Sequence, residues 1–280
     1  MELVCKPKLD VVFKAIFTEN PDLLADFVGL ALETEIEDLQ ILNNDILPES
    51  YNEKFSRLDI LVKTKGGEKI NVELQNSNKG NFKERSVFYC SKLYTSDLQS
   101  GKDYSEIAKT VCINILQFNL FDSENYRSTV LPIIKETGET LTDRWKIIFF
   151  ETPKFPEDIE SLKVTKNRLG YWLTFFSVGT EEALVNVDNL NDKEIKKAVS
   201  VVRHMNADER MREIARNRED AWLAEKLSLA EAKKEGITTG IELGEQNTML
   251  RVAKNMLTER IAIDVIEKVT GLTQNELLSL

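Results

Sequence analysis

Asp59 and Glu73 are the two side chains whose type and spacing could support chemistry. They lie in segment 57–75, RLDILVKTKGGEKINVELQ, in which two alternating apolar runs flank a Gly-Gly pair. This pattern predicts a β-hairpin. Two carboxylates that meet across a hairpin, with the polar Gln75 two positions after Glu73, would suit a divalent metal ion.

The register of the hairpin decides whether the two carboxylates meet. A two-residue loop would place the apolar residues of the two strands on opposite faces of the hairpin. The three-residue loop 65–67 brings them together on one face and is therefore expected. It places Asp59 directly across from Glu73 on the other face. The apolar pairs predicted by this register are Leu58–Leu74, Ile60–Val72 and Val62–Ile70.

Magnesium is the cation that this arrangement favours, with Mn²⁺ as the alternative. Mg²⁺ binds oxygen ligands and keeps several of its waters. Asp59 and Glu73 would each supply one ligand, and the backbone carbonyl of Leu74 would supply a third. A cation bound there would polarise a phosphate and lower the pKa of an attacking water. The alternative is that both acids are solvated side chains of an exposed hairpin.

Composition excludes several other kinds of site. The 280 residues include one histidine, His204, and three widely spaced cysteines, Cys5, Cys90 and Cys112. A multi-histidine metal site, a zinc ribbon and a disulfide framework are therefore excluded, and a cytoplasmic location is expected. The net charge of −10 argues against a protein that coats nucleic acid through bulk charge, although a metal-dependent nuclease stays possible. Neither a membrane-spanning run nor a signal peptide is expected.

The elements around the hairpin predict a mixed α/β sandwich. Apolar spacing predicts helices over 9–17 and 21–32, with Asn20 as the N-cap of the second, followed by a loop around Pro48. A helix is expected over 82–99, and strands over 110–118 and 146–151. The nearly continuous apolar run of 110–118 is typical of a strand covered on both faces. Residues 156–235 are expected to be mostly helical, with Trp172, Phe175 and Phe176 in the core.

The C-terminal region is predicted to be an assembly module. Gly236, Gly240 and Gly244 recur every four residues, which would align them on one helix face for close helix–helix approach. A frayed helix or a turn is the alternative reading of these glycines. Thr273 and Glu276 form the pattern of a capping box before a final helix. The last two helices have a helix-turn-helix outline, but the second lacks Lys and Arg, which favours homodimer assembly over DNA readout.

Several segments together resemble the Rpn family of recombination-promoting nucleases and transposases, within the PD-(D/E)XK nuclease superfamily. The nuclease signature is similar to Asp59 followed by Glu73-Leu74-Gln75. The segments KPKLDVVFKAIF, GKDYSEIAKTVCINIL and ETPKF carry the rest of the resemblance, which covers most of residues 1–180. The resemblance implies a restriction-endonuclease-like mixed sheet flanked by helices, with an all-α C-terminal extension.

The resemblance also implies roles for individual residues. Asp59 and Glu73 would be catalytic metal ligands, and Gln75 stands where the superfamily usually has lysine. Lys83 or Arg85 could restore that positive charge. Asp10 could reach the metal, with capping of the first helix as its alternative role. Residues that could contact DNA phosphate are Lys14, Lys83, Arg85 and Tyr89, although Arg85 and Tyr89 could instead brace their helix against the sheet.

The function implied is Mg²⁺- or Mn²⁺-dependent cleavage of DNA phosphodiesters, in recombination or transposition or in defence against foreign DNA. The expected parts are a nuclease domain over 1–185, a helical extension over 186–235 and an assembly module over 236–280. The alternative is a catalytically inactive protein of the same fold that acts as an interaction or regulatory module through its C-terminal helices.

Overall fold

The structure of the protein is a computed structural model that describes residues 1–42, 45–46, 56–57, 59–78, 80–96, 98 and 103–280. It divides into two compact units, Met1–Glu219 and Asp220–Leu280. The boundary lies within one continuous helix, α8 (Glu209–Thr258). The predicted division at residues 185 and 235 stays a prediction.

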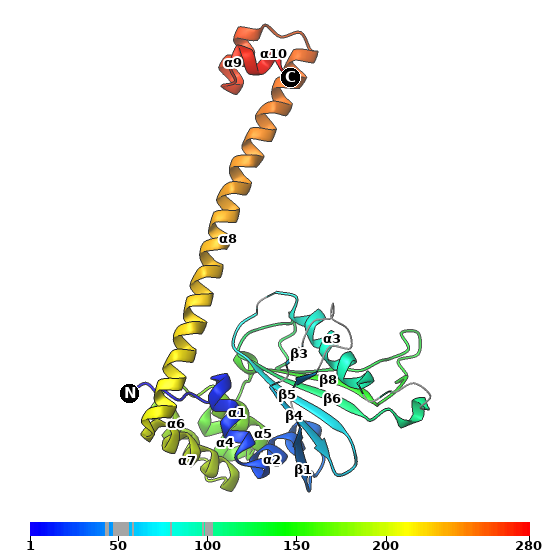
Figure 1. The fold of residues 1–280 in the computed structure, drawn as a ribbon, viewed down its shortest axis with the longest axis vertical. Helices are drawn as coiled ribbons and strands as arrows, with labels where there is room; N and C mark the ends of the chain where they lie inside the picture. The colour runs from blue at the N-terminus through cyan, green and yellow to red at the C-terminus, as the bar shows by residue number, and fades with distance from the viewer. Residues whose placement is uncertain (43–44, 47–55, 58, 79, 97, 99–102) are drawn as a thin grey trace. The chain divides into compact units, whose positions relative to one another are not determined.

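A six-stranded mixed sheet forms the centre of the first unit (Figure 1). Its strand order is β1-β4-β5-β6-β8-β7, in which β5, β6 and β8 are parallel and the other neighbours are antiparallel. The strands are β1 (Leu39–Leu42), β4 (Ile60–Thr64), β5 (Lys69–Gln75), β6 (Thr110–Leu116), β7 (Arg127–Val130) and β8 (Trp145–Glu151). A separate two-stranded ladder joins β2 (Asp45–Ile46) and β3 (Ser56–Arg57).

The hairpin of β4 and β5 has the predicted register. Ile60 pairs with Val72 and Val62 with Ile70. The Thr64 N–H donates to the Glu68 carbonyl over 2.9 Å, which leaves residues 65–67 as the loop. Gly67 has a φ of +85°, a value that L side chains rarely adopt. The expected pairing of Leu58 with Leu74 lies outside the described residues.

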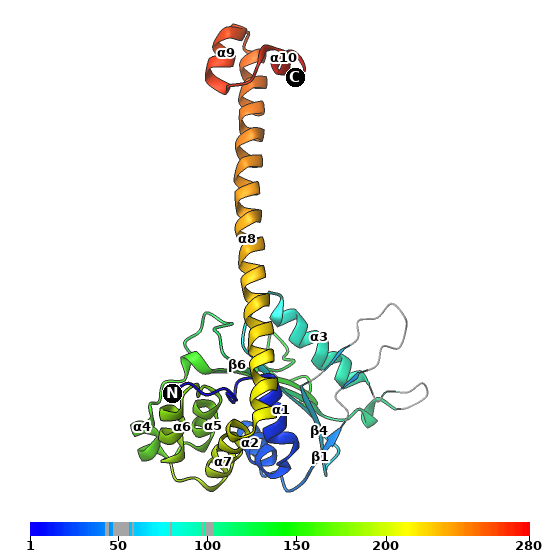
Figure 2. The same ribbon diagram turned by 60° about the vertical axis from the view of Figure 1, so that its left-hand side comes forward.

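One face of the sheet packs against a helical layer (Figures 1 and 2). This layer begins with α1 (Asp10–Thr18) and α2 (Pro21–Leu32). It continues after β8 with α4 (Ile159–Thr165), α5 (Arg168–Phe176), α6 (Glu181–Asp188) and α7 (Lys193–Ala207). Trp172, Phe175 and Phe176 are fully buried in this core, as predicted. The apolar residues Ile60, Val62, Ile70, Val72 and Leu74 face this core, which leaves the polar set of β5 on the opposite face together with Leu61 of β4.

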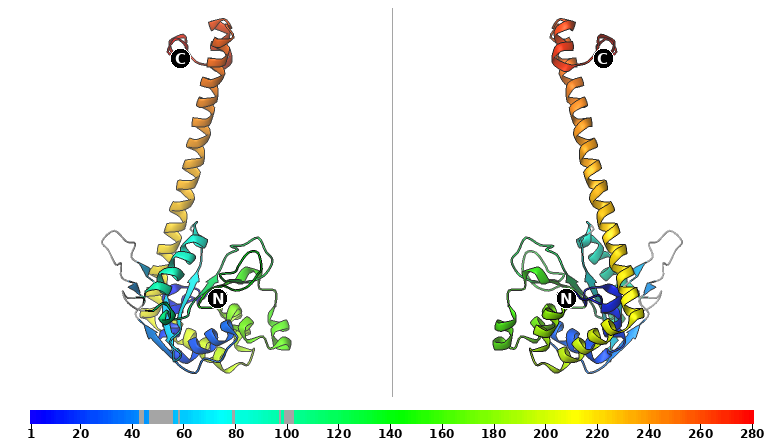
Figure 3. Two further views of the ribbon diagram at one scale, coloured as in Figure 1. Left: turned by 90° about the vertical axis from the view of Figure 1, so that its right-hand side faces the viewer. Right: turned by 90° about the vertical axis from the view of Figure 1, so that its left-hand side faces the viewer.

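The opposite face of the sheet is covered by α3 (Phe82–Thr95), which is labelled with α1 and α2 in Figure 2 and seen from two further sides in Figure 3. Phe82, Cys90 and Leu93 of this helix pack against apolar side chains of β4, β6 and β8. All seven residues of β6 are buried, which confirms that this strand is covered on both faces. Short 3₁₀ helices precede β6 (Tyr104–Glu106) and follow β8 (Thr152–Lys154).

The second unit contains the remainder of α8, then α9 (Ile263–Thr270) and α10 (Gln274–Leu278). Ala253, Ile266 and Leu277 form the centre of a small apolar cluster among these helices. The predicted capping box of Thr273 and Glu276 is present. None of the helices in the described ranges is long and apolar enough to cross a membrane.

Three local features differ from the sequence-based expectation. The edge strands β1 and β7 were not predicted, because LQIL and RSTV are too short to show a clear alternation. Asn20 precedes α2, but its side chain makes no capping bond there and donates instead to the Ile16 carbonyl at the end of α1 (2.8 Å). The predicted loop around Pro48 lies in a segment that is not described.

Candidate active site

The hairpin brings Asp59 and Glu73 close together: the Glu73 side chain lies on the face of the sheet that carries α3, and Asp59 lies at the start of β4, within reach of Lys14 of α1. Glu73 lies on β5, and Asp59 immediately precedes β4. If the register of the β4–β5 ladder is extended by one residue beyond the Ile60–Val72 pair, Asp59 stands opposite Glu73. Asp59 Oδ2 accepts a hydrogen bond from the backbone N–H of Leu74 over 3.3 Å. The side chain of Asp59 is therefore held against β5 beside Glu73.

Glu73 is a buried carboxyl group, with 5% of its surface exposed. Its burial, reinforced by the negative charge of Asp59, raises its pKa to about 7. Two side-chain amides contact it: Asn71 Nδ2 donates to Glu73 Oε1 over 2.9 Å, and Gln75 Nε2 lies 3.4 Å from Oε2. The carboxyl group is thus oriented from both sides along its own strand.

Arg85 on α3 extends this chain of polar contacts. Its Nη2 donates to Gln75 Oε1 over 3.2 Å, and its guanidinium lies 4.9 Å from the centre of the Phe82 ring. Lys83 is oriented differently, with its Nζ 4.9 Å from the centre of the Phe121 ring. Lys83 and Arg85 were both considered as replacements for the usual lysine. Of these two side chains, Arg85 is the one that contacts Gln75.

The first helix supplies a second cation to the acids. Lys14 Nζ lies 3.0 Å from Asp59 Oδ1, and both side chains are partly buried. Asp10, one helical turn earlier, is bound through both oxygens by Arg218 of α8, at 2.8 and 2.5 Å. The structure therefore brings Lys14 to the two acids and shows Asp10 engaged with another partner.

Tyr89 lies on α3 and is only partly buried. Its ring centre is 5.7 Å from that of Phe88, and it packs against the apolar cluster beneath the helix. This packing matches the bracing role considered for Tyr89, while its remaining exposure keeps phosphate contact available.

Two features of the site were missed by the sequence analysis. Lys69, Asn71, Glu73 and Gln75 alternate along β5, so one whole face of a buried strand is polar, a signal that would have identified Asn71. The ETPKF segment fixes the loop after β6: Glu151 accepts from the backbone N–H of Phe121 (3.1 Å), and Lys154 donates to the Phe121 carbonyl (2.6 Å). This loop carries the ring beneath Lys83.

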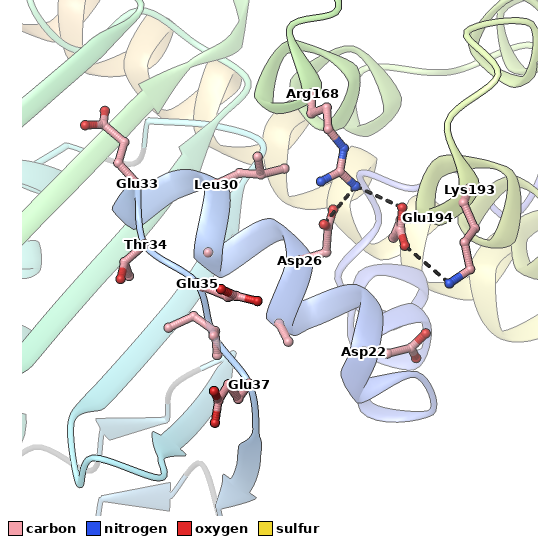
Figure 4. Close-up of a pocket in the computed structure, with 13 residues that line it drawn as sticks. Asp22, Asp26, Leu30, Glu33, Thr34, Glu35, Glu37, Arg168, Lys193 and Glu194 are labelled. Atoms are coloured by element: carbon pink, nitrogen blue, oxygen red, sulfur yellow. Dashed lines mark hydrogen bonds and ion pairs between the residues drawn. The ribbon is translucent and has the colours of Figure 1, made fainter.

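An open pocket of about 720 Å³ lies elsewhere in the first unit (Figure 4). It is lined mainly by α2 and the segment that follows it, whose acids in the lining include Asp22, Glu33, Glu35 and Glu37. Arg168 crosses one side of it and binds Asp26 and Glu194, at 2.8 and 2.9 Å. The predominance of carboxylates makes this pocket an unfavourable surface for a phosphate backbone.

The donor set at Asp59 and Glu73 fits a hard divalent cation better than zinc. Among the residues that the structure describes, no group of three or more His, Cys, Asp or Glu side chains could hold a metal ion. Two carboxylates and a backbone carbonyl, completed by water, are the kind of oxygen ligands that Mg²⁺ accepts. The N–H and C=O groups of one strand residue point to the same side, so the Leu74 carbonyl should share the side on which Asp59 lies.

The comparison with protein-family models identifies the family of the chain. The model of the PD-(D/E)XK nuclease family transposases matches residues 7–232, which is most of the chain. The protein belongs to the PD-(D/E)XK nuclease family transposases. Searches of curated proteins and of solved structures found no match.

As a PD-(D/E)XK family member, the protein has the mixed sheet and flanking helices that the sequence resemblance implied. The matched region includes both acids, Gln75 and the cations from α1 and α3, and it ends within α8. Family membership supports a nuclease-like function.

Proposed function

We propose that the protein is a metal-dependent DNA endonuclease that hydrolyses phosphodiester bonds with Mg²⁺ or Mn²⁺. The observation that carries this proposal is the buried Glu73 carboxyl on β5 beside Asp59, which immediately precedes the neighbouring strand β4. The two acids stand in the sequence order of the nuclease signature that the chain resembles. A buried carboxyl beside a second acid is unfavourable unless positive charge balances the pair, which is why such pairs are typical of metal sites.

Asp59, Glu73 and the Leu74 carbonyl would hold the cation. When bound, the cation would supply Lewis-acid polarisation of the phosphate and a more acidic water. Asn71 and Gln75 orient the Glu73 carboxyl through the hydrogen bonds described above. Asp10 is a less favourable ligand, since Arg218 binds both of its oxygens.

The DNA phosphates would be met by a local group of cations around the acids. Lys14 of α1 contacts Asp59, and Arg85 of α3 contacts Gln75. Lys83 and Tyr89 lie within about one turn of Arg85 on α3 and would supply further phosphate contacts. A site of this kind can engage a phosphate although the net charge of the whole chain is −10. Recombination, transposition or defence against foreign DNA would be the biological setting, in the cytoplasm.

Incubation of the purified full-length protein with supercoiled plasmid DNA tests the proposal. We expect nicked or linear products with Mg²⁺ or Mn²⁺ and none with EDTA, because the carboxylates alone would repel phosphate. Binding of partner proteins without any cleavage in either metal would favour the alternative, an inactive nuclease fold that acts as an interaction or regulatory module.

We also propose that the protein forms a homodimer through its C-terminal helices. Gly236, Gly240 and Gly244 lie in the continuous helix α8, and a Cβ added at any of them would meet no atom within 4 Å in the described chain. Each glycine costs an exposed helix about 1 kcal/mol relative to alanine. A close contact with a second copy would offset this cost.

Substitution of Gly240 by Leu should therefore shift the protein from dimer to monomer, because the side chain would separate the two helices. Light scattering measures the mass, and the melting of the nuclease core should not change. Thr239→Leu, which lies off the glycine stripe, is the matched control and should stay dimeric. A monomeric wild type, or a Gly240→Leu variant that is still dimeric, would contradict the proposal.

A further inference from the structure

Both oxygens of the Asp59 carboxylate have partners in the structure. Oδ2 accepts from the Leu74 N–H at 3.3 Å, and Oδ1 lies 3.0 Å from Lys14 Nζ. The Leu74 N–H belongs to a β-strand and cannot move without disrupting the sheet. Lys14 reaches Asp59 from the surface of α1 on a flexible stem, and 29% of its side chain is exposed. Lys14 is therefore the partner that an arriving ligand can displace.

The neighbouring charges direct Lys14 to this position. Asp10 lies one turn before Lys14 on α1, where an acid would normally attract a lysine four residues later. Arg218 binds Asp10 through both of its oxygens, so that negative charge is already balanced. Lys14 balances the charge of Asp59 instead. A divalent cation and an ammonium group on the same carboxylate would repel each other strongly in this partly buried site.

We infer that Lys14 takes the place of the divalent cation beside Asp59 in the metal-free protein and moves to a phosphate oxygen of DNA when the cation binds. This inference rests on the proposed nuclease function. Before the reaction Lys14 competes with the metal for the Asp59 carboxylate, and during the reaction it is a catalytic residue that contacts the phosphate. A lysine that only braces α1 against the sheet would take no part in the reaction.

Two measurements on Lys14→Met test the inference. Titration calorimetry of Mn²⁺ into DNA-free protein should show binding about fivefold tighter than in wild type, because a partly buried ion pair no longer competes. At saturating Mn²⁺, turnover on plasmid DNA should fall by at least about tenfold, because a positive charge on the phosphate is lost. Affinity and turnover thus change in opposite directions.

Lys14→Arg keeps the charge and should bind Mn²⁺ as wild type does. Lys197→Met, which breaks the exposed Lys197–Asp22 pair of 2.7 Å, is the matched control and should leave both measurements unchanged. Unchanged or weaker Mn²⁺ binding by Lys14→Met would overturn the competition, and unchanged turnover would overturn the phosphate contact. If wild type binds no Mn²⁺ and cleaves no DNA, the proposed function fails and the inference fails with it.

Discussion

Replacement of Glu73 by Gln is expected to abolish DNA cleavage and, at the same time, to stabilise the metal-free protein at alkaline pH. The amide is a much poorer metal ligand than the carboxylate, so turnover should fall by roughly a thousandfold. Its shape is nearly that of the carboxyl group. Asn71 Oδ1, which is buried and has no hydrogen-bond partner among the described residues, could then accept from the new amide.

The gain in stability has a defined pH dependence. The pKa of Glu73 is about 7 in the folded protein against an ordinary 4.5, chiefly because the carboxyl is buried and secondly because Asp59 is close. The folded state thus binds the proton more tightly, and wild-type stability should fall as pH rises from about 4.5 to 7 and stay low above that. Glutamine binds no proton there, so the advantage of Glu73→Gln should grow over this range to about 3 kcal/mol.

Urea denaturation of the metal-free proteins at pH 4 and pH 8 measures this difference. Glu84→Gln, an exposed change on α3, is the control and should show little effect at either pH. Mg²⁺ should raise the melting temperature of wild type but not of Glu73→Gln, because only wild type binds it. An active Glu73→Gln enzyme, or an equal gain in stability at both pH values, would refute the assignment of Glu73.

The hairpin and its acids were predictable because two constraints acted on the same residues. The alternation of β4 and β5 defined their faces, and only an odd loop kept the apolar faces together. Once one apolar pair of the hairpin is assigned, the position of every other pair follows, including that of Asp59 with Glu73. The edge strands β1 and β7 have no such second constraint, since each is short and has a neighbour on one side only.

Contacts between distant segments could not be predicted in this way. Asp10 and Arg218 are 208 residues apart, and nothing in the local pattern of either indicates that they pair. The choice between Lys83 and Arg85 was partly accessible, because residues two apart on a helix do not face the same side. The spacing implied that at most one of them would face Gln75, but the packing of α3 on the sheet decides which one.

The second large effect is expected at Arg85. Arg85→Met should lower turnover by roughly a hundredfold if, as we propose, the Arg85 charge replaces that of the usual lysine. Arg85 donates to Gln75 Oε1, which turns the Gln75 amide nitrogen toward Glu73. Methionine can keep the contact with the Phe82 ring, so the helix should remain packed. Turnover on plasmid DNA at saturating Mn²⁺ is the measurement.

Gln75→Lys supplies the decisive comparison. It places a positive charge on β5 itself, where the superfamily signature has lysine, so the double variant Gln75→Lys/Arg85→Met should recover most of the lost turnover. Lys83→Met is the matched control. Like Arg85 at the Phe82 ring, the Lys83 side chain lies 4.9 Å from the centre of an aromatic ring, in its case that of Phe121. This variant should cost about threefold, as expected for one peripheral phosphate contact. If Lys83→Met is the more damaging variant, or if Gln75→Lys rescues nothing, the charge does not act through Gln75.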